Sequence, residues 1–195
     1  RKIQCLIELR LYEKATQIIQ NEIKSTPSDV SLFVAYGNLL ERQGQHEKAK
    51  TEYRKAIDKL DPDPGNITNL ASSFTNLAKY DLAIETYLKG EKISNVQNLY
   101  VYNLADLYRR QGDVKNMIKY YLITAEKEPS SINIQTSLQR FLSVADYEEL
   151  QKQLYQKIQE KATIPHYGEP VSYKHLTLPT RELEKNWVVA RSLKK

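Results

Sequence analysis

The residue types that most often carry out chemistry are few and scattered in this chain. Cys5 is the single cysteine among 195 residues, and the three histidines are His46, His166 and His175. None of these residues has a cysteine or histidine partner at the spacing of a metal site, and Cys5 has no second cysteine for an internal disulfide. The sequence therefore predicts a protein that is not an enzyme, holds no cofactor or metal, and buries Cys5 in its core.

The composition is that of a well-ordered, soluble and helical chain. Hydrophobic residues make up 41% and charged residues 27% of the sequence, which contains only 6 glycines. These values exclude a disordered or low-complexity protein. No apolar run approaches the roughly 20 residues that cross a bilayer, so no membrane span is expected. The chain opens with Arg1 and without a signal peptide, so its start is missing or processed, and both the cytoplasm and the periplasm remain open as compartments.

A fixed period of 34 residues organises most of the sequence. Small residues recur at this step as Ala15, Ala49 and Ala83, and Met117 takes the next position. The same step also relates Ile19, Tyr53, Tyr87 and Tyr121, and it relates Gly37, Ala71 and Ala105. Periods in this range are typical of arrays in which each supersecondary unit stacks on the next.

Each period consists of two amphipathic helices. In the clearest unit, apolar residues at three- and four-residue spacing predict helices over about 29–42 and 46–59. Gly37 and Ala49 are expected where these helices face each other, because small residues let two backbones approach closely. Met117 is larger than this position favours, which puts the tightness of the fourth hairpin in question. Tyr53 is expected to fill the gap towards the next hairpin.

Glycine, proline and serine mark the ends of the predicted helices. Gly44 and Gly112 stand where a first helix must end, since glycine adopts the left-handed conformation without a Cβ penalty, and Ala78 takes this place in the third unit. Prolines follow the second helices at Pro27, Pro62 and Pro129. The hydroxyls of Ser28 and Ser130 are expected to cap the next first helices.

The period and its pattern of small, large and proline positions resemble the tetratricopeptide repeat (TPR) family. Two units carry the pattern most fully, through Gly37, Leu40, Ala49, Tyr53, Ala56 and Pro62, and through Ala71, Phe74, Ala83, Tyr87 and Gly90. The resemblance covers about residues 1–162. It implies an all-α fold, an α-solenoid of antiparallel helical hairpins wound into a right-handed superhelix. Long arrays of this kind are frequent in bacteria, so the resemblance also implies a bacterial protein.

The repeat divides the chain into units and indicates a fragment of a longer array. We expect a truncated first unit over 1–28, three good units over 29–64, 65–96 and 97–129, a degenerate unit over 130–162 and the start of a further unit over 163–169. The degenerate unit keeps an apolar stripe of Ile134, Leu138, Phe141, Tyr147, Leu150, Leu154 and Ile158. Neither end has the polar capping repeat that solenoids need, so the uncapped ends offer surfaces for self-association.

Residues 170–195 break the register and are predicted to be a non-native or disordered tail. The stretch from Pro170 to Thr180 resembles, apart from Lys174, the translation of a sequencing-library adaptor that is read through into the coding sequence. The tail contributes +4 of the formal net charge of +5, which leaves 23 basic and 22 acidic residues in the repeats. A near-neutral array argues against binding to nucleic acid or to a membrane surface.

The resemblance implies a scaffold that binds a peptide or protein partner in a concave groove lined by the first helices. Mapped onto this chain, the groove residues are Asn38, Glu41, Arg42, Asn69, Ser72, Asn76, Tyr102, Asn103, Asp106, Arg109 and Arg110. Carboxamides donate to and accept from an extended peptide backbone, and arginines pair with acidic groups. One subclass of the family binds a C-terminal carboxylate. Asn38 and Asn69 match its amide positions, whereas Val34 and Leu99 stand where it has basic residues.

Two other functions are compatible with the same repeats. A recruiting or regulatory segment of a larger multidomain enzyme would have such a sequence, because the catalytic domain would lie outside it. Helical repeats of other families bind RNA with one base per repeat, but the near-neutral charge of this array argues against that function. The pattern does not identify the partner.

Overall fold

The computed structural model describes residues 2–127 and 132–162, and all regular secondary structure in these ranges is helical. This is the predicted all-α fold, built from helical hairpins of the α-solenoid class. The expected start of a further unit at 163–169 and the tail at 170–195 lie outside the described residues, as do Pro129 and Ser130. Residues 1–100 and 101–195 form two separate compact units, called unit 1 and unit 2 below.

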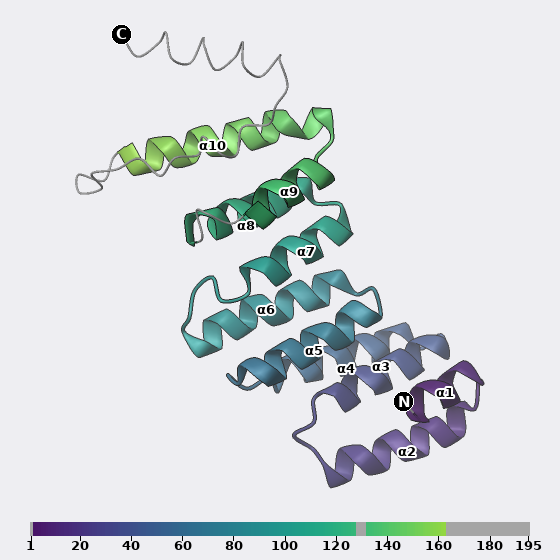
Figure 1. Cartoon of the computed structure of the whole chain (residues 1–195). Coiled ribbons are helices and arrows are strands. Elements are labelled where there is room, and N and C mark those ends of the chain that lie inside the picture. The colour runs from purple at the N-terminus through teal and green to yellow at the C-terminus, as the bar shows by residue number, and fades with distance from the viewer. Residues whose placement is uncertain (1, 128–131, 163–195) are drawn as a thin grey trace, which may run out of the picture. The chain divides into compact units, whose positions relative to one another are not determined.

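Unit 1 consists of successive helical hairpins. Its helices are α1 (Lys2–Glu8), α2 (Tyr12–Ser25), α3 (Ser31–Arg42), α4 (His46–Asp58), α5 (Pro64–Asn76) and α6 (Tyr80–Ser94). Each odd-numbered helix packs against the helix that follows it, which gives the hairpins α1/α2, α3/α4 and α5/α6 (Figure 1). Because α3 also contacts α1 and α5, the first helices of these hairpins lie side by side.

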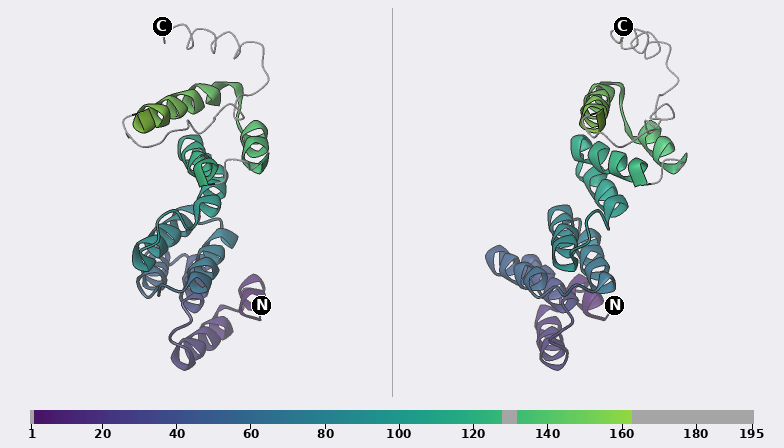
Figure 2. Two further views of the ribbon diagram at one scale, coloured as in Figure 1. Left: turned by 60° about the vertical axis from the view of Figure 1, so that its left-hand side comes forward. Right: turned by 90° about the vertical axis from the view of Figure 1, so that its left-hand side faces the viewer.

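Unit 2 begins with another regular hairpin and continues into a less regular helix pair. Its elements are α7 (Val101–Gln111), α8 (Val114–Lys127), α9 (Ile132–Phe141), the 3₁₀ turn η1 (Val144–Asp146) and α10 (Tyr147–Ala162). Helix α8 packs against α7, α9 and α10, and Figure 2 shows the order of the helices from two further directions. Met117 on α8 is only 2% exposed, so the core of this hairpin accommodates the larger side chain.

A left-handed residue recurs every 34 positions, within two residues of the end of α1, α3, α5 and α7. Gly44 and Gly112 have φ values of 77° and 79°, as predicted, and Ala78 has a φ of 56°. Arg10 occupies the same register position after α1, with a φ of 58°. The turn therefore keeps one backbone geometry whether or not glycine is present. At Arg10 and Ala78 the rest of the hairpin must offset the cost of a Cβ in this conformation.

Close packing in the α3/α4 hairpin depends on Gly37. A Cβ at Gly37 would come within 2.4 Å of Cε1 in the ring of Tyr53, so a hydrogen at this position makes room for the ring. Tyr53 is 3% exposed, and its ring also meets Phe74 of α5 edge-on, with a centroid distance of 5.7 Å. The prediction that Tyr53 fills the gap towards the next hairpin is confirmed. The same ring also packs within its own hairpin.

Side-chain links between consecutive second helices recur at one spacing. Arg54 on α4 pairs with Glu85 on α6, and Lys89 lies 3.7 Å from Asp58 across the same two helices. In unit 2, Lys157 on α10 pairs with Glu126 on α8 at 2.8 Å. Each of these pairs joins residues 31 positions apart, because equivalent turns of two stacked helices are separated by nearly one repeat. Lys89 also donates a 2.7 Å hydrogen bond to the carbonyl oxygen of Ile57, near the end of α4.

Two predictions about individual residues are wrong. Cys5 is exposed on α1, where its side chain lies outside the core that Ile7, Ala15 and Ile19 form. Ser28 does not cap α3. The N-cap residue is Val30, which has no side-chain cap, and the carboxylate of Asp29 shapes the turn before the helix by accepting hydrogen bonds from the backbone N–H and the hydroxyl of Ser31.

The N-terminus of α5 is capped by the side chain of an aspartate. Asp63 is the N-cap residue of α5, and its carboxylate accepts a 2.9 Å hydrogen bond from the backbone N–H of Asn66. Pro64 opens the helix, where its missing N–H costs nothing.

Across the described ranges, no helix is both long and apolar enough to cross a bilayer.

Candidate functional site

Three exposed polar side chains form a stripe on α5 of unit 1, called the α5 face below. Asn69, Ser72 and Asn76 follow one another at three- and four-residue spacing, which places them on one side of the helix. All three are exposed, and their side chains form no hydrogen bond within the described part of the chain. They are therefore available to donate hydrogen bonds to a partner and to accept them from it.

The predicted residues of α3 lie in a more enclosed setting, because α3 packs against both α1 and α5. Asn38 is only 5% exposed, and its carboxamide forms no hydrogen bond with any described residue. Glu41 is partly buried, whereas Arg42 at the end of the helix is exposed and has no ion-pair partner among the described residues. Periodicity placed these three residues correctly on α3 but could not distinguish their degrees of burial.

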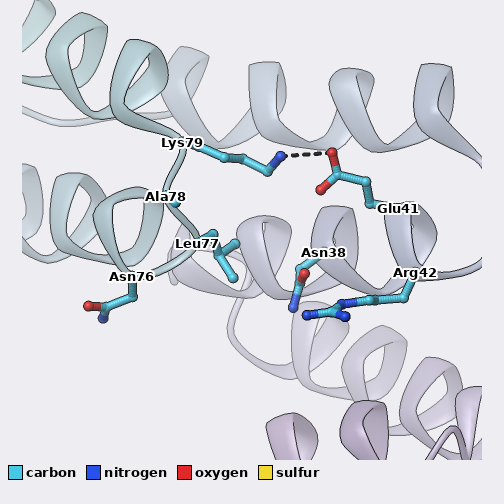
Figure 3. Close-up of a pocket in the computed structure, with 7 residues that line it drawn as sticks. All are labelled: Asn38, Glu41, Arg42, Asn76, Leu77, Ala78 and Lys79. Atoms are coloured by element: carbon cyan, nitrogen blue, oxygen red, sulfur yellow. Dashed lines mark hydrogen bonds and ion pairs between the residues drawn. The ribbon is translucent and has the colours of Figure 1, made fainter. Parts of the chain in front are cut away.

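A recess of about 430 Å³ lies at the C-terminal ends of α3 and α5 (Figure 3). Its lining contains the predicted residues Asn38, Glu41, Arg42 and Asn76, and also Leu77, Ala78 and Lys79 from the turn between α5 and α6. The last three were not predicted. The residues one repeat before and one repeat after Lys79 are Gln45 and Asp113, and neither is basic. The repeat pattern therefore did not predict a cation at this position.

Glu41 is held by two donors at the edge of this recess. The hydroxyl of Tyr53 donates a 2.9 Å hydrogen bond to Oε2, and the ammonium of Lys79 donates a 2.7 Å hydrogen bond to Oε1. The Nζ atom of Lys79 also lies 5.0 Å from the centre of the Tyr53 ring, within the range of a cation–π contact. These contacts join the α3/α4 hairpin to the start of α6.

Burial and hydrogen bonding shift the pKa values of this cluster in a consistent way. Burial by itself raises the pKa of the Glu41 carboxyl, but the hydrogen bonds from Lys79 and Tyr53 outweigh it, so the pKa lies below its ordinary value. Burial, together with the hydrogen bond to the Glu41 carboxylate, raises the pKa of the Tyr53 hydroxyl. At neutral pH, Glu41 is therefore an anion and Tyr53 a neutral donor.

In unit 2, the predicted residues of α7 form an intrahelical ion-pair cluster. Arg109 donates to Oδ1 of Asp106 from Nε at 3.0 Å and from Nη2 at 2.6 Å, and Arg110 donates from Nε to Oδ2 at 2.6 Å. Burial raises the pKa of the Asp106 carboxyl, but the hydrogen bonds from both arginines outweigh it and lower this pKa below its usual value. One carboxylate thus contacts two guanidinium groups on the same helix.

An aromatic ring extends this cluster beyond the residues that the repeat register predicts. The guanidinium of Arg109 lies 4.6 Å from the ring centre of Phe141, and that of Arg140 lies 5.6 Å from the same ring. Tyr102 and Asn103, the remaining predicted residues of α7, are exposed. Phe141 was predicted only as part of an apolar stripe, because its repeat unit is degenerate.

Two kinds of site are incomplete among the described residues, a metal centre and the carboxylate-binding pattern. No group of three His, Cys, Asp or Glu side chains within the described ranges has the geometry of a metal site. The carboxylate-binding pattern of the subclass named above is not completed, since Val34 is buried at 2% exposure and Leu99 is an exposed leucine.

Comparison with known proteins agrees with the repeat and the fold. Residues 30–63, which contain α3 and α4, and residues 101–132, which contain α7 and α8, each match a tetratricopeptide repeat model. A TPR repeat-containing protein of Methanocaldococcus jannaschii is 30% identical over 95 residues, which are 49% of this chain and 17% of that relative. The chain thus spans less than a fifth of the length of the curated relative that it matches.

The matched segments coincide with complete helical hairpins, and the turn geometry repeats with the same 34-residue step in the hairpins that were not matched. Repeats of this class generally mediate interactions between proteins. The hairpins α3/α4 and α7/α8 are thus tetratricopeptide repeats, and the chain is similar over about half of its length to a protein that contains such repeats.

Proposed function

We propose that this chain is an interaction scaffold and that unit 1 binds an extended segment of a protein partner through the α5 face. The observation that carries the proposal is the state of Asn69, Ser72 and Asn76, which are exposed and form no hydrogen bond within the described residues. Carboxamides and hydroxyls at this spacing match the alternating donors and acceptors of a peptide backbone.

The exposed side of α7 offers a second contact surface in unit 2. Tyr102 is 44% exposed, and large amphipathic aromatic residues of this kind are enriched at protein interfaces. Arg109, Arg110 and Asp106 add charged groups to this surface, which can pair with charged segments of a partner. The support for this surface is exposure and charge, and it is independent of the α5 face.

A selection from a displayed library of random peptides tests the proposal on the full chain. We expect selected peptides to lose at least tenfold in affinity for the triple variant Asn69→Ala, Ser72→Ala and Asn76→Ala, since each lost hydrogen bond weakens binding by about 1 kcal/mol. Calorimetry measures the affinities, and circular dichroism checks that the variant remains helical.

A matched control has the same spacing on another helix. The triple variant Lys48→Ala, Thr51→Ala and Lys55→Ala changes exposed residues of α4 at identical intervals. The assignment of the α5 face is wrong if both triple variants bind the selected peptides equally well. A failure to select any peptide, together with a steep salt-dependent affinity for single-stranded RNA, would replace protein binding by nucleic-acid binding as the function.

A further inference from the structure

We infer that the recess at the ends of α3 and α5 is a subsite for the carboxylate of an acidic side chain of the bound partner. The inference rests on the proposed function, because it assigns one specific chemistry to a recess beside the α5 face. It is distinct from the carboxylate-binding pattern of the TPR subclass, since its cation would be Arg42, one turn beyond Asn38 along α3.

The first observation is the carboxamide of Asn38, which has no internal partner. Its side chain lines the recess and is 5% exposed, yet it forms no hydrogen bond with a described residue. Among the described residues, the fully enclosed side-chain atom without a hydrogen-bond partner is the hydroxyl of Tyr100, so the polar atoms of the Asn38 amide remain accessible from the recess. Because Asn38 lines the recess, a ligand that enters the recess can accept a hydrogen bond from the Asn38 amide.

The second observation is the guanidinium of Arg42. Figure 3 shows it beside the carboxamide of Asn38, and it forms no ion pair or hydrogen bond within the described ranges. A guanidinium presents its N–H donors in a planar fork that fits the two oxygens of a carboxylate. Asn38 and Arg42 together therefore offer convergent donors and one uncompensated positive charge.

The other charges around the recess do not cancel the positive charge of Arg42. Lys79 also lines the recess, but its ammonium is paired with Glu41 at 2.7 Å, so these two residues contribute no net charge. The C-terminal ends of α3 and α5 carry partial negative charge, which opposes an anion. The full charge of Arg42 exceeds these partial charges. A carboxylate, which accepts hydrogen bonds directly from two or three donors, is the anion that best complements the charge of Arg42.

The probes for the test are three tetrapeptides, each acetylated at its N-terminus. The first is tetraglutamate with an amidated C-terminus, the second is tetraglutamine with an amidated C-terminus, and the third is tetraglutamine with a free C-terminal carboxylate. Nuclear magnetic resonance of the full chain reports binding through the side-chain N–H signals of Asn38 and Arg42. We expect the amidated tetraglutamate to shift both signals and the amidated tetraglutamine to shift neither.

Two variants separate this subsite from a general charge effect. Arg42→Gln is expected to weaken the binding of amidated tetraglutamate about tenfold, since charged hydrogen bonds are the strong ones. Lys50→Gln removes the same charge from an exposed site on α4 and is expected to change the affinity less than about twofold, because solvent and salt screen it. Equal weakening by both variants would overturn the inference.

Stability measurements add an independent readout for Asn38. The Asn38 carboxamide has no hydrogen-bond partner among the described residues, so its replacement by an apolar group of similar size breaks no internal hydrogen bond. Asn38→Leu is therefore expected to change the Tm by less than about 2 °C while it weakens the binding of amidated tetraglutamate. A larger fall in the Tm would mean that the amide has a structural partner, and the inference would then be wrong.

The remaining outcomes separate this inference from the proposed function. Binding of the free C-terminal carboxylate without binding of tetraglutamate would overturn the assignment to an acidic side chain. If no tetrapeptide binds, but library-selected peptides bind through the α5 face, the inference fails and the proposed function stands. If neither class of peptide binds, both are wrong.

Discussion

The hydroxyl of Tyr53 donates a 2.9 Å hydrogen bond to the carboxylate of Glu41, which joins the two helices of one hairpin beside the recess. The ring of the same tyrosine occupies the space where a Cβ of Gly37 would lie. One residue thus connects core packing, through its ring, with the polar edge of the candidate site, through its hydroxyl. Changes in the core of this hairpin are therefore expected to disturb the recess.

Gly37→Ala tests this connection. The added Cβ would lie 2.4 Å from Cε1 of Tyr53, so the ring must move away from Glu41. We expect the free energy of unfolding to fall by about 1–3 kcal/mol, as for other overpacked cores. The double variant Gly37→Ala with Tyr53→Leu removes the clash, so chemical denaturation should give a cost well below the sum of the two single costs. Additive costs would contradict the contact.

The repeated left-handed turn allows a reciprocal pair of substitutions. Gly44→Ala meets no atom within 4 Å, so its cost arises from the backbone alone, at roughly 1–2 kcal/mol. Ala78→Gly at the equivalent position relieves the same strain and is expected to stabilise the chain by about 1 kcal/mol. Thermal unfolding of the two variants should show shifts of opposite sign. Shifts of the same sign would show that the two turns are not equivalent.

The contribution of Glu41 to stability depends on pH. Its pKa in the folded chain lies below the ordinary value of 4.5, so the charged form stabilises the fold at neutral pH, and this stabilisation is lost as the pH falls through the lowered pKa. Glu41→Gln is expected to cost about 1 kcal/mol at pH 7 and less at pH 3. Urea titrations at both pH values measure the difference. An equal cost at both would exclude the ionic role of Glu41.

Lys89 and Arg54 make a matched pair for the links between second helices. Lys89 donates to the carbonyl of Ile57 and is 28% exposed, whereas the Arg54 side chain is 54% exposed in its pair with Glu85. We expect Lys89→Met to lower the free energy of unfolding by about 1 kcal/mol. Arg54→Met should lower it by less than about 0.5 kcal/mol, since solvent screens exposed pairs. Denaturation in urea measures the loss of stability in each variant. A larger loss in Arg54→Met than in Lys89→Met would contradict the greater contribution assigned to Lys89.

The sequence by itself determined the architecture, because the repeat is written in local signals. The 34-residue step, the small residues at Ala49 and Ala83 and the left-handed turns at Gly44 and Gly112 each act within one hairpin. Such signals depend on helix periodicity and backbone conformation, which the neighbouring residues set. For the same reason, the residues of the α5 face could be placed on one side of a helix from spacing alone.

Only the tertiary structure decided how these residues are used. The exposure of Cys5, the burial of Asn38 and the arrival of Lys79 beside Glu41 each depend on which helices become neighbours. Contacts between hairpins join residues far apart in the sequence, such as Glu41 and Lys79, and a degenerate pattern tolerates many side chains at those positions. Burial and pairing are therefore properties of the packed array, and they decide which polar residues are satisfied internally and which remain available to a partner.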